Sequence, residues 1–488
     1  MNVAIIGSGF SGTGLAIQLK RSGEESFVVL ERENTLGGTW RDNHYPGAAC
    51  DVQSHLYSYS FKPKPDWSRV YARQPEILQY LRDCATSEGI VEHMRFDSEV
   101  LEAAWIEESN EWLISTTNGD YAARVLVSAS GHLSDPKYPD IAGIEDFAGA
   151  KFHSARWDHD TALDGKRVGV IGTGASAIQI VPEVAKVAGN LTVFQRSAPY
   201  VVPRLDREYT AGERNMFARL PHTAQKLRRD LFWASEARFP QRRGIESFIS
   251  RVERLALDHL ANQIADPVLR AKLTPDYAVG CKRVLISNQY FPTFLRENVE
   301  LETRGIDHIT ENAVVMADGT RHELDVLIVS TGFEASDLPI ARRIRGRDGL
   351  LLADHWADGE QAYACSTVNG FPNLFIMNGP NSGLGAGSII FVIESQIDYI
   401  LGALDYLGRN GYTRIEVRQE AETEFAAMLD RKAQGTVWLD GGCKSWYVDQ
   451  RNGRLSVIWP DFMSRFRDSN GVFRPEAYEV RALAGSAV

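Results

Sequence analysis

Residues 3–31 read VAIIGSGFSGTGLAIQLKRSGEESFVVLE, and this stretch decides the fold. An apolar run is followed by Gly7, Gly9 and Gly12, then by apolar residues at helical spacing, then by a second apolar run that ends at Glu31. In such a turn the first glycine permits the tight bend, the second lets backbone approach a pyrophosphate, and the third lets helix pack on strand. The stretch therefore predicts a β-turn-α-β unit with a nucleotide at the N-terminus of its helix.

The same arrangement occurs again at residues 168–196, which read VGVIGTGASAIQIVPEVAKVAGNLTVFQR. Gly172, Gly174 and Ala177 occupy the three turn positions of this second unit. A glycine motif alone is a weak signal, but each copy here follows a strand pattern and precedes a helix pattern. Two such units predict an α/β chain with two Rossmann-like, doubly wound dinucleotide-binding domains.

The residue that ends each unit predicts which nucleotide the unit holds. Glu31 follows Gly7 by 24 positions, and Arg196 follows Gly172 by the same 24. A carboxylate at this place accepts hydrogen bonds from ribose hydroxyls and repels a 2′-phosphate, whereas an arginine binds that phosphate. We therefore expect NADPH on the second unit, with Ser197 as a further donor, and FAD on the first, as the acceptor of a hydride from NADPH. The competing interpretation is that Arg196 merely faces solvent.

Composition places the chain among ordinary globular proteins. With 488 residues, 44% of them hydrophobic and 24% charged, it is expected to form two or three domains. The net charge of −11 argues against general binding to nucleic acids or anionic membranes. The apolar runs are too short for a membrane span and the glycine-rich start does not resemble a signal peptide, so no membrane partner is expected.

The five cysteines stand far apart, at positions 50, 84, 281, 365 and 443. No Cys-x-x-Cys occurs, so neither a metal site nor a redox-active disulfide is expected. Such cysteine usage is typical of the reducing cytoplasm, where we expect the protein to work. Electrons on the flavin must then pass to oxygen or to a small acceptor.

An arginine-rich stretch with helical periodicity interrupts the second nucleotide unit, and we expect its arginines to form a solvated face without a ligand. The predicted divisions are an FAD-binding domain at 1–135 and 331–488, a linker at 136–153, an NADP-binding domain at 154–205 and 277–330, and a helical insertion at 206–276.

A motif between the two units resembles a family fingerprint. Residues 147–158 read FAGAKFHSARWD and fit the pattern FxGxxxHxxxW(P/D) of type I Baeyer–Villiger monooxygenases. Other stretches similar to that family are Gly37-Gly38-Thr39-Trp40 followed by Tyr45-Pro46-Gly47 and Asp51, the run Gly280-Cys281-Lys282-Arg283, and Ser445-Trp446-Tyr447, which resembles the loop that covers the nicotinamide. The similarity extends from Ile5 to about Pro460.

The resemblance implies a reaction in which NADPH reduces FAD, O2 forms a C4a-peroxyflavin, and one oxygen atom enters a ketone to give an ester or lactone. It places Asp51 and Arg283 at the reaction centre. An arginine there stabilises the anionic peroxide and the oxyanion that follows, and a buried Arg283 would need Asp51 as its anionic partner. Lys282 is expected to reach the 2′-phosphate with Arg196. His153 is expected to be structural, linking NADP binding to domain movement.

The candidate cofactor-binding residues around FAD are Gly7, Gly9, Phe10, Gly12, Glu31, Gly38, Thr39, Trp40, Asp51, Tyr57 and Val100, and those around NADPH are Gly172, Thr173, Gly174, Ser176, Ala177, Arg196, Ser197, Lys282, Arg283 and Trp446.

Two other functions stay open at this point. A flavin monooxygenase that oxygenates nitrogen or sulfur would use a protonated hydroperoxide without an arginine beside it. A non-oxygenating NADPH-dependent flavin reductase would transfer its electrons directly to an acceptor. The expected partners are a small-molecule ketone and O2, in a monomer or a homodimer.

Overall fold

The computed structural model describes residues 1–482, and two five-stranded parallel sheets organise it. The first sheet has the order β19-β7-β1-β2-β3. Its strands are β1 (Val3–Ile6), β2 (Phe27–Leu30), β3 (Met94–Arg95), β7 (Val125–Ser128) and β19 (Leu374–Ile376). The chain therefore leaves this sheet after β7 and returns to it more than two hundred residues later, with β19.

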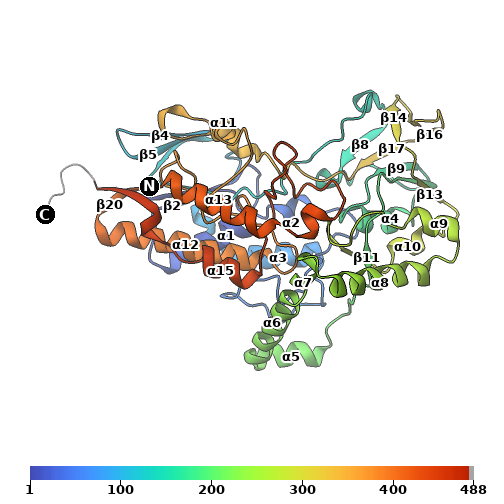
Figure 1. Cartoon of the computed structure of the whole chain (residues 1–488), viewed down its shortest axis with the longest axis horizontal. Coiled ribbons are helices and arrows are strands. Elements are labelled where there is room, and N and C mark those ends of the chain that lie inside the picture. Colours follow the sequence, from blue (N-terminus) through green and yellow to red (C-terminus); the bar gives the residue numbers. More distant parts are fainter. Residues whose placement is uncertain (483–488) are drawn as a thin grey trace.

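The second sheet has the order β13-β10-β9-β17-β8. Its strands are β8 (Ala150–His153), β9 (Arg167–Ile171), β10 (Asn190–Phe194), β13 (Val299–Glu302) and β17 (Val326–Val329). The expected linker at 136–153 is therefore wrong at its end, because Ala150–His153 pairs with β17 as an edge strand. The two sheets confirm the predicted α/β class with two Rossmann-like units, and they lie at opposite ends of the long axis (Figure 1).

Each sheet has its own hydrophobic core. Helices α1 (Phe10–Arg21), α3 (Gln74–Ser87) and α12 (Ile389–Asn410) contribute buried side chains to one cluster with β1 and β2. Helices α4 (Ala177–Val184) and α10 (Tyr290–Thr293) contribute to another with β9 and β10. The N-terminal and C-terminal parts of the chain thus share the first lobe, as the blue and red ribbons show in Figure 1.

The predicted insertion is helical. It consists of α5 (Ala211–Arg219), α6 (Pro221–Glu236), α7 (Phe239–Arg242), α8 (Glu246–Gln263) and α9 (Pro267–Lys272). The expectation that its arginines form one solvated face is wrong for two of them. Arg228 donates to the carbonyls of His55, Leu56 and Ser58, and Arg242 donates to the carbonyl of Gly385. Both reach loops of the first lobe, where burial lowers the pKa of each guanidinium.

Smaller sheets and short helices complete the structure. A mixed sheet contains β4 (Val100–Ile106), β5 (Glu111–Thr116), β6 (Gly119–Ala123) and β18 (Ile344–Arg345), and an antiparallel one contains β14 (Ile306–Ile309), β15 (Ala313–Met316) and β16 (Arg321–Glu323). The remaining elements are α2 (Thr39–Asp42), α11 (Leu352–His355), α13 (Gln419–Ala433), α14 (Val437–Asp440), α15 (Met463–Asn470), β11 (Val201–Val202), β12 (Leu285–Ile286), β20 (Tyr412–Val417) and β21 (Tyr478–Ala482). Among the described residues, short 3-10 helices lie at Val91–His93, Ile144–Asp146, Ser154–Arg156, Pro339–Arg343, Arg347–Gly349 and Pro475–Ala477.

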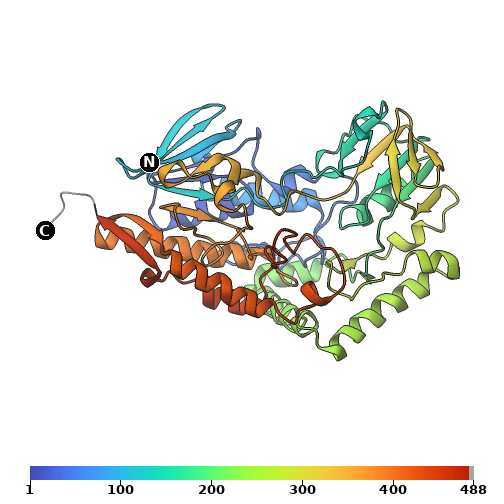
Figure 2. The same ribbon diagram turned by 45° about the horizontal axis from the view of Figure 1, so that its top comes forward.

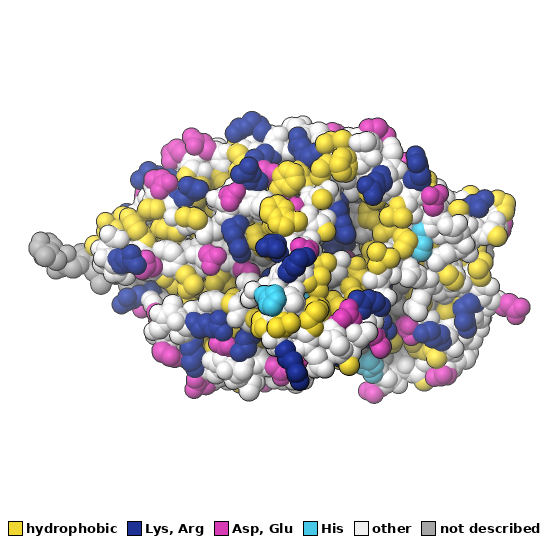
Figure 3. Space-filling view, turned by 90° about the horizontal axis from the view of Figure 1, so that it is seen from below, with side chains coloured by type: hydrophobic (Ala, Val, Ile, Leu, Met, Phe, Trp, Pro, Cys, Tyr) yellow, Lys and Arg dark blue, Asp and Glu magenta, His cyan; other side chains and the backbone are white. Residues whose placement is uncertain are grey.

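The segment after α14 turns back towards the centre of the molecule, where the dark red loop lies between the two lobes in Figure 2. Seen from below, acidic, basic and hydrophobic side chains are interspersed across the face in Figure 3. Within residues 1–482, no helix is both long and apolar enough to cross a membrane.

The cysteines differ from expectation. Cys281 and Cys443 form a disulfide across 162 positions of sequence, while Cys50, Cys84 and Cys365 are free and buried. A Cys-x-x-Cys pattern identifies only cysteines that are close in sequence. Cys281 and Cys443 meet because the C-terminal segment packs against the residues that follow the helical insertion, and no local pattern indicates that contact.

Candidate functional site

A cavity of about 190 Å³ lies at the carboxyl ends of β1 and β2, beside the N-terminus of α1. Carboxyl ends of parallel strands are where nucleotides bind in open α/β sheets. The predicted residues that line it are Gly7, Gly9, Phe10, Glu31, Gly38, Thr39, Trp40, Tyr57 and Val100. Gly12 packs beneath the turn rather than in the cavity wall, and Asp51 lies outside the wall.

The glycines of this turn are needed for close backbone packing. A Cβ on Gly12 would lie 1.9 Å from the carbonyl oxygen of Gly7, which is itself at φ +100°. A Cβ at position 9 would meet the Cα of Gly38 at 3.6 Å, an ordinary van der Waals contact, so the steric requirement applies to Gly7 and Gly12. Backbone rather than side chains therefore forms this part of the cavity, which fits a pyrophosphate bound by main-chain amides at a helix N-terminus.

Glu31 is fixed at the end of β2 by several donors. One carboxylate oxygen accepts from the backbone N–H of Ser8 at 3.0 Å and from its hydroxyl at 2.6 Å. The other lies 3.0 Å from a guanidinium nitrogen of Arg41. These contacts fix the carboxylate in the cavity wall, where it can accept from ribose hydroxyls.

Several cavity residues were missed by the sequence reasoning. Arg41 follows the predicted Thr39-Trp40 pair directly, so its place beside that motif could have identified it. The others come from loops after β2, β7 and β19, from the Pro339–Arg343 turn and from the start of α12, and no spacing rule connects them. They are Arg32, Ser130, Asp135, Arg343, Asn378, Ile389 and Ile393.

The second glycine turn repeats the geometry of the first. Gly172 is at φ +115°, and a Cβ there would lie 2.3 Å from the carbonyl oxygen of Ser330 at the end of β17. Gly174 has open space around it, and α4 begins at Ala177 with Ser176 as its N-cap residue. The Thr173 hydroxyl donates to the Ser197 carbonyl at 3.0 Å. This turn leaves room for a second pyrophosphate at a helix N-terminus.

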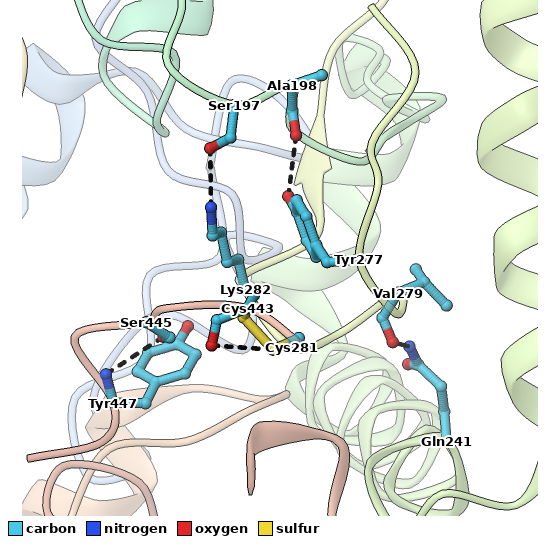
Figure 4. The surroundings of a disulfide bond; sticks show 10 residues. All are labelled: Ser197, Ala198, Gln241, Tyr277, Val279, Cys281, Lys282, Cys443, Ser445 and Tyr447. Atoms are coloured by element: carbon cyan, nitrogen blue, oxygen red, sulfur yellow. Dashed lines mark hydrogen bonds between the residues drawn. A yellow bond between two sulfur atoms is a disulfide. The ribbon is translucent and has the colours of Figure 1, made fainter. Parts of the chain in front are cut away.

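Three predicted phosphate ligands meet beside that turn. Lys282 donates from Nζ to the Ser197 hydroxyl at 2.8 Å (Figure 4). Burial lowers the pKa of Lys282, and the charge of Arg196 lowers it further. The charge of Asp276 acts on the pKa of Lys282 in the opposite direction, but within residues 1–482 neither cation has a carboxylate at ion-pair distance. Two neighbouring cations that repel one another fit a dianion such as a 2′-phosphate, because it would relieve the repulsion.

Asp51 and Arg283 form an ion pair that joins the two lobes. The Arg283 Nη2 and Nε atoms lie 2.7 and 2.8 Å from the same Asp51 oxygen, Oδ2. The pair is only partly buried: the Arg283 side chain is 40% exposed and that of Asp51 is 28% exposed. The Asp51 charge raises the pKa of the guanidinium. Arg283 is therefore a fixed cation with one side open.

The C-terminal segment reaches this pair. Tyr447 is buried, and burial raises the pKa of its hydroxyl while the nearby charge of Arg283 acts in the opposite direction. Trp446 is 45% exposed, and its ring centroid lies 6.3 Å from that of His132, which follows the cavity residue Gly131. Tyr447 belongs to the Ser445–Tyr447 motif but is not among the predicted site residues. Its position beside Arg283 makes it a candidate site residue.

His153 is wholly buried at the end of β8. Its Nδ1 accepts from the backbone N–H of Ala155 at 3.1 Å, and its ring packs against Phe333 and Tyr138. Burial lowers the pKa of the imidazole to about 4, so the ring is neutral near pH 7. This environment fits the expected structural role.

Comparison with known proteins identifies the family. Residues 4–211 match the family model described as pyridine nucleotide-disulphide oxidoreductase. The chain is 45% identical to a Baeyer–Villiger monooxygenase of Streptomyces coelicolor over 100% of this chain and 95% of that protein. It is 44% identical to a Baeyer–Villiger monooxygenase of Pseudomonas aeruginosa over 98% of this chain and 91% of that protein.

Solved structures lead to the same family. The chain superimposes on NADP⁺-bound cyclohexanone monooxygenase from Rhodococcus sp. Phi1 with a TM-score of 0.86, at 30% identity and over 99% of each chain. It superimposes on OTEMO in complex with FAD and NADP with a TM-score of 0.87, at 28% identity and over 99% of each chain. The predicted resemblance is confirmed: this chain belongs to the Baeyer–Villiger monooxygenase family.

Proposed function

We propose that this protein is an FAD- and NADPH-dependent monooxygenase that converts a ketone into an ester or lactone. The observation that carries the proposal is the Asp51–Arg283 ion pair. It holds a partly exposed guanidinium group between the two nucleotide-binding lobes. Family membership and the two glycine turns support it. When bound, NADPH supplies a hydride and FAD uses it to activate O2; the protein positions both and controls the charge around them.

In this proposal the first lobe holds FAD. Main-chain amides around Gly7 and Gly9 and the N-terminus of α1 bind the pyrophosphate. Glu31 accepts from the ribose hydroxyls, and Thr39, Trp40 and Tyr57 form the wall towards the second lobe. The Trp40 indole N–H donates to the Tyr57 hydroxyl at 3.0 Å, which keeps both rings in place.

The second lobe holds NADPH. Gly172 and Gly174 give the pyrophosphate access to the N-terminus of α4. Arg196, Ser197 and Lys282 bind the 2′-phosphate, since their positive charge is otherwise uncompensated by a direct ion pair in the described chain. The preference for NADPH over NADH follows from that pair of cations.

Arg283 has the role of an electrostatic catalyst. Negative charge develops on oxygen when a ketone carbonyl is attacked, and a fixed cation with an open side stabilises that charge. Asp51 contacts two nitrogens of the guanidinium and so orients it. The same cation argues against a chemistry that needs a protonated, electrophilic oxygen donor, as N- or S-oxygenation does.

The test uses purified holoenzyme with NADPH, ¹⁸O2 and a panel of cyclic, linear and aryl ketones. We expect an ester or lactone that carries one ¹⁸O atom per NADPH consumed. Amines and thioethers serve as the comparison panel. Oxidation of NADPH that yields only hydrogen peroxide with every ketone, or products from the amines and thioethers alone, would overturn the proposal.

We expect a cytoplasmic location from the sparse, widely spaced cysteines. The Cys281–Cys443 bond points the other way, because disulfides are rare in a reducing compartment.

A further inference from the structure

The Cys281–Cys443 bond joins two segments that carry site residues. Cys281 directly precedes Lys282 and Arg283, and Cys443 begins the segment that contains Ser445, Trp446 and Tyr447. We call residues 441–447 the covering loop. Figure 4 shows the bond between the Lys282–Ser197 contact on one side and Tyr447 on the other. A covalent link therefore connects the proposed 2′-phosphate ligands to the loop beside Arg283.

The segment that contains Cys281 is firmly held. Cys281 is 1% exposed and belongs to a hydrophobic cluster with Tyr200 and Tyr277. The Tyr277 hydroxyl donates to the Ala198 carbonyl at 3.1 Å, and Gln241 donates to the Val279 carbonyl at 3.0 Å (Figure 4). This half of the disulfide would keep its position if the bond were broken.

The covering loop is held less firmly. Gly442, Lys444 and Trp446 are exposed, and Cys443 is half-buried, so a small reductant can approach the bond from the Cys443 side. The Ala278 N–H donates to the Gly441 carbonyl at 2.9 Å. Gly441, Ser445 and Tyr447 are buried, so the loop is anchored on both sides of its exposed stretch, residues 442–444. Exposed backbone opens at lower free energy than buried backbone. The disulfide thus fixes the least anchored part of the loop.

The packing around the sulfur atoms is specific. A Cβ on Gly441 would lie 2.7 Å from the Cβ of Cys281 and 3.0 Å from its sulfur, so the loop approaches as closely as only glycine allows.

From these features we propose that Cys281 and Cys443 form a reversible redox latch that positions the covering loop over the proposed nicotinamide site. This inference rests on the proposed function. In the disulfide form, Tyr447 stays beside Arg283 and NADP⁺ is retained. In the dithiol form the loop opens more often, so NADP⁺ dissociates faster and the site is open to water.

The chemistry of the latch is balanced in both directions. Two external thiols reduce the bond to two cysteine thiols and become a disulfide themselves. Hydrogen peroxide closes it: a cysteine thiolate attacks the peroxide and becomes a sulfenic acid, and the released hydroxide takes up a proton from solvent to give water. The partner thiol then displaces a second water from the sulfenic acid as the S–S bond forms. A flavin monooxygenase releases hydrogen peroxide when it consumes NADPH and O2 without transferring oxygen to a substrate. Peroxide released in this way would close the latch.

The experiment compares three forms of the holoenzyme: the disulfide form, the same protein after dithiothreitol, and Cys443→Ser. Mass spectrometry after alkylation counts the thiols. Stopped-flow absorbance measures reduction of FAD by NADPH, and calorimetry measures NADP⁺ affinity. We expect dithiothreitol to weaken NADP⁺ binding on the order of tenfold, the size of a typical coupling between sites. The rate of FAD reduction at saturating NADPH should change little. Peroxide followed by removal of excess should restore the affinity.

Cys443→Ser provides the matched control, because Cys443 is half-buried and its loss leaves no large cavity. This variant should behave like the reduced enzyme and should respond to neither dithiothreitol nor peroxide. A purely structural disulfide would lower thermal stability on reduction and leave NADP⁺ affinity unchanged, and that result would overturn the latch. Absence of the bond in protein purified without reductant would also overturn it. None of these measurements needs a ketone, so failure of the proposed oxygenation would be seen separately.

Discussion

Arg283 and Asp51 depend on each other although 232 positions separate them in the sequence. Arg283 comes from the segment after the helical insertion, and Asp51 from a loop of the first lobe. The Asp51 carboxylate covers only part of the guanidinium group. Both contacts go to one carboxylate oxygen, and the arginine side chain stays 40% exposed. The remaining donors are free to stabilise an anion.

Replacement of this cation should separate reduction from oxygenation. In Arg283→Ala, we expect FAD reduction by NADPH to stay within a few-fold of wild type, while ester formation falls at least about 100-fold, the usual cost of a lost oxyanion donor. NADPH would then be consumed with release of peroxide. Arg283→Lys is the control, because it keeps the positive charge but loses the planar guanidinium group and its set of donors. Ester formation retained by Arg283→Ala would show that another residue supplies the charge.

Arg196 should determine the choice of cofactor. Arg196→Ala is expected to reduce the preference for NADPH over NADH by about 2–3 kcal/mol, because a charge-assisted contact with the 2′-phosphate is lost. The ratio of kcat/KM for the two cofactors measures it. Lys282→Ala should have an effect in the same direction, since Lys282 and Arg196 lie close enough for one charge to lower the pKa of the other. An unchanged ratio in both variants would contradict the assignment.

At the scale of elements, the first β-turn-α unit depends on contact between backbone atoms. Gly12 lies in the first turn of α1, where the carbonyl of Gly7 fills the space that a side chain would need. No rotamer relieves that clash, because it involves the Cβ itself. The strand, the turn and the helix N-terminus can therefore be brought together only with glycine at this position.

Gly12→Ala should abolish FAD binding. A Cβ placed 1.9 Å from a carbonyl oxygen forces the helix away from the strand and disrupts the cavity. We expect the variant to be purified without yellow colour or to be insoluble. Gly408→Ala is the matched control, because Gly408 is in α12 with open space around it. Visible absorbance per mole of protein decides the outcome, and full FAD content in Gly12→Ala would contradict this account of the turn.

At the scale of the whole molecule, the chain returns to the first lobe after completing the second. The returning segment carries buried polar side chains. Glu422 in α13 is wholly buried, and one of its oxygens accepts from the backbone N–H of Asn369 at 2.8 Å. Its other oxygen has no hydrogen-bond partner among the described residues. Burial raises the pKa of this carboxyl to about 7.

This carboxyl should make stability depend on pH. The pKa of Glu422 in the folded protein lies above the ordinary value of 4.5. Its contribution to the free energy of unfolding is therefore fully present below pH 4.5 and is lost as pH rises through 7. Relative to Glu422→Gln, wild type should lose about 3 kcal/mol of unfolding free energy over that range. Urea unfolding at pH 5 and pH 8 measures the difference. Parallel losses in both proteins would indicate that Glu422 is not the group responsible.

Local patterns predicted the elements well. The strands of both nucleotide units, the turns at Gly7 and Gly172, and the insertion helices all follow from short-range sterics and hydrophobic periodicity. The edge strand at Ala150–His153 was missed, because four residues of mixed polarity carry little strand signal. The arginines of the insertion were misjudged for a related reason: periodicity shows which face is apolar, but it does not show which loop will cover that face.

The two dinucleotide units and the nucleotide suited to each follow from the residue pattern, because the steric effect of glycine and the charge at the end of the second strand act within about thirty residues. The folded chain was needed to show that Asp51 meets Arg283, that Tyr447 lies beside them, and that Cys281 is bonded to Cys443. Each of these contacts joins segments more than 150 positions apart. Such contacts depend on how the lobes pack together, and no spacing along the chain encodes that.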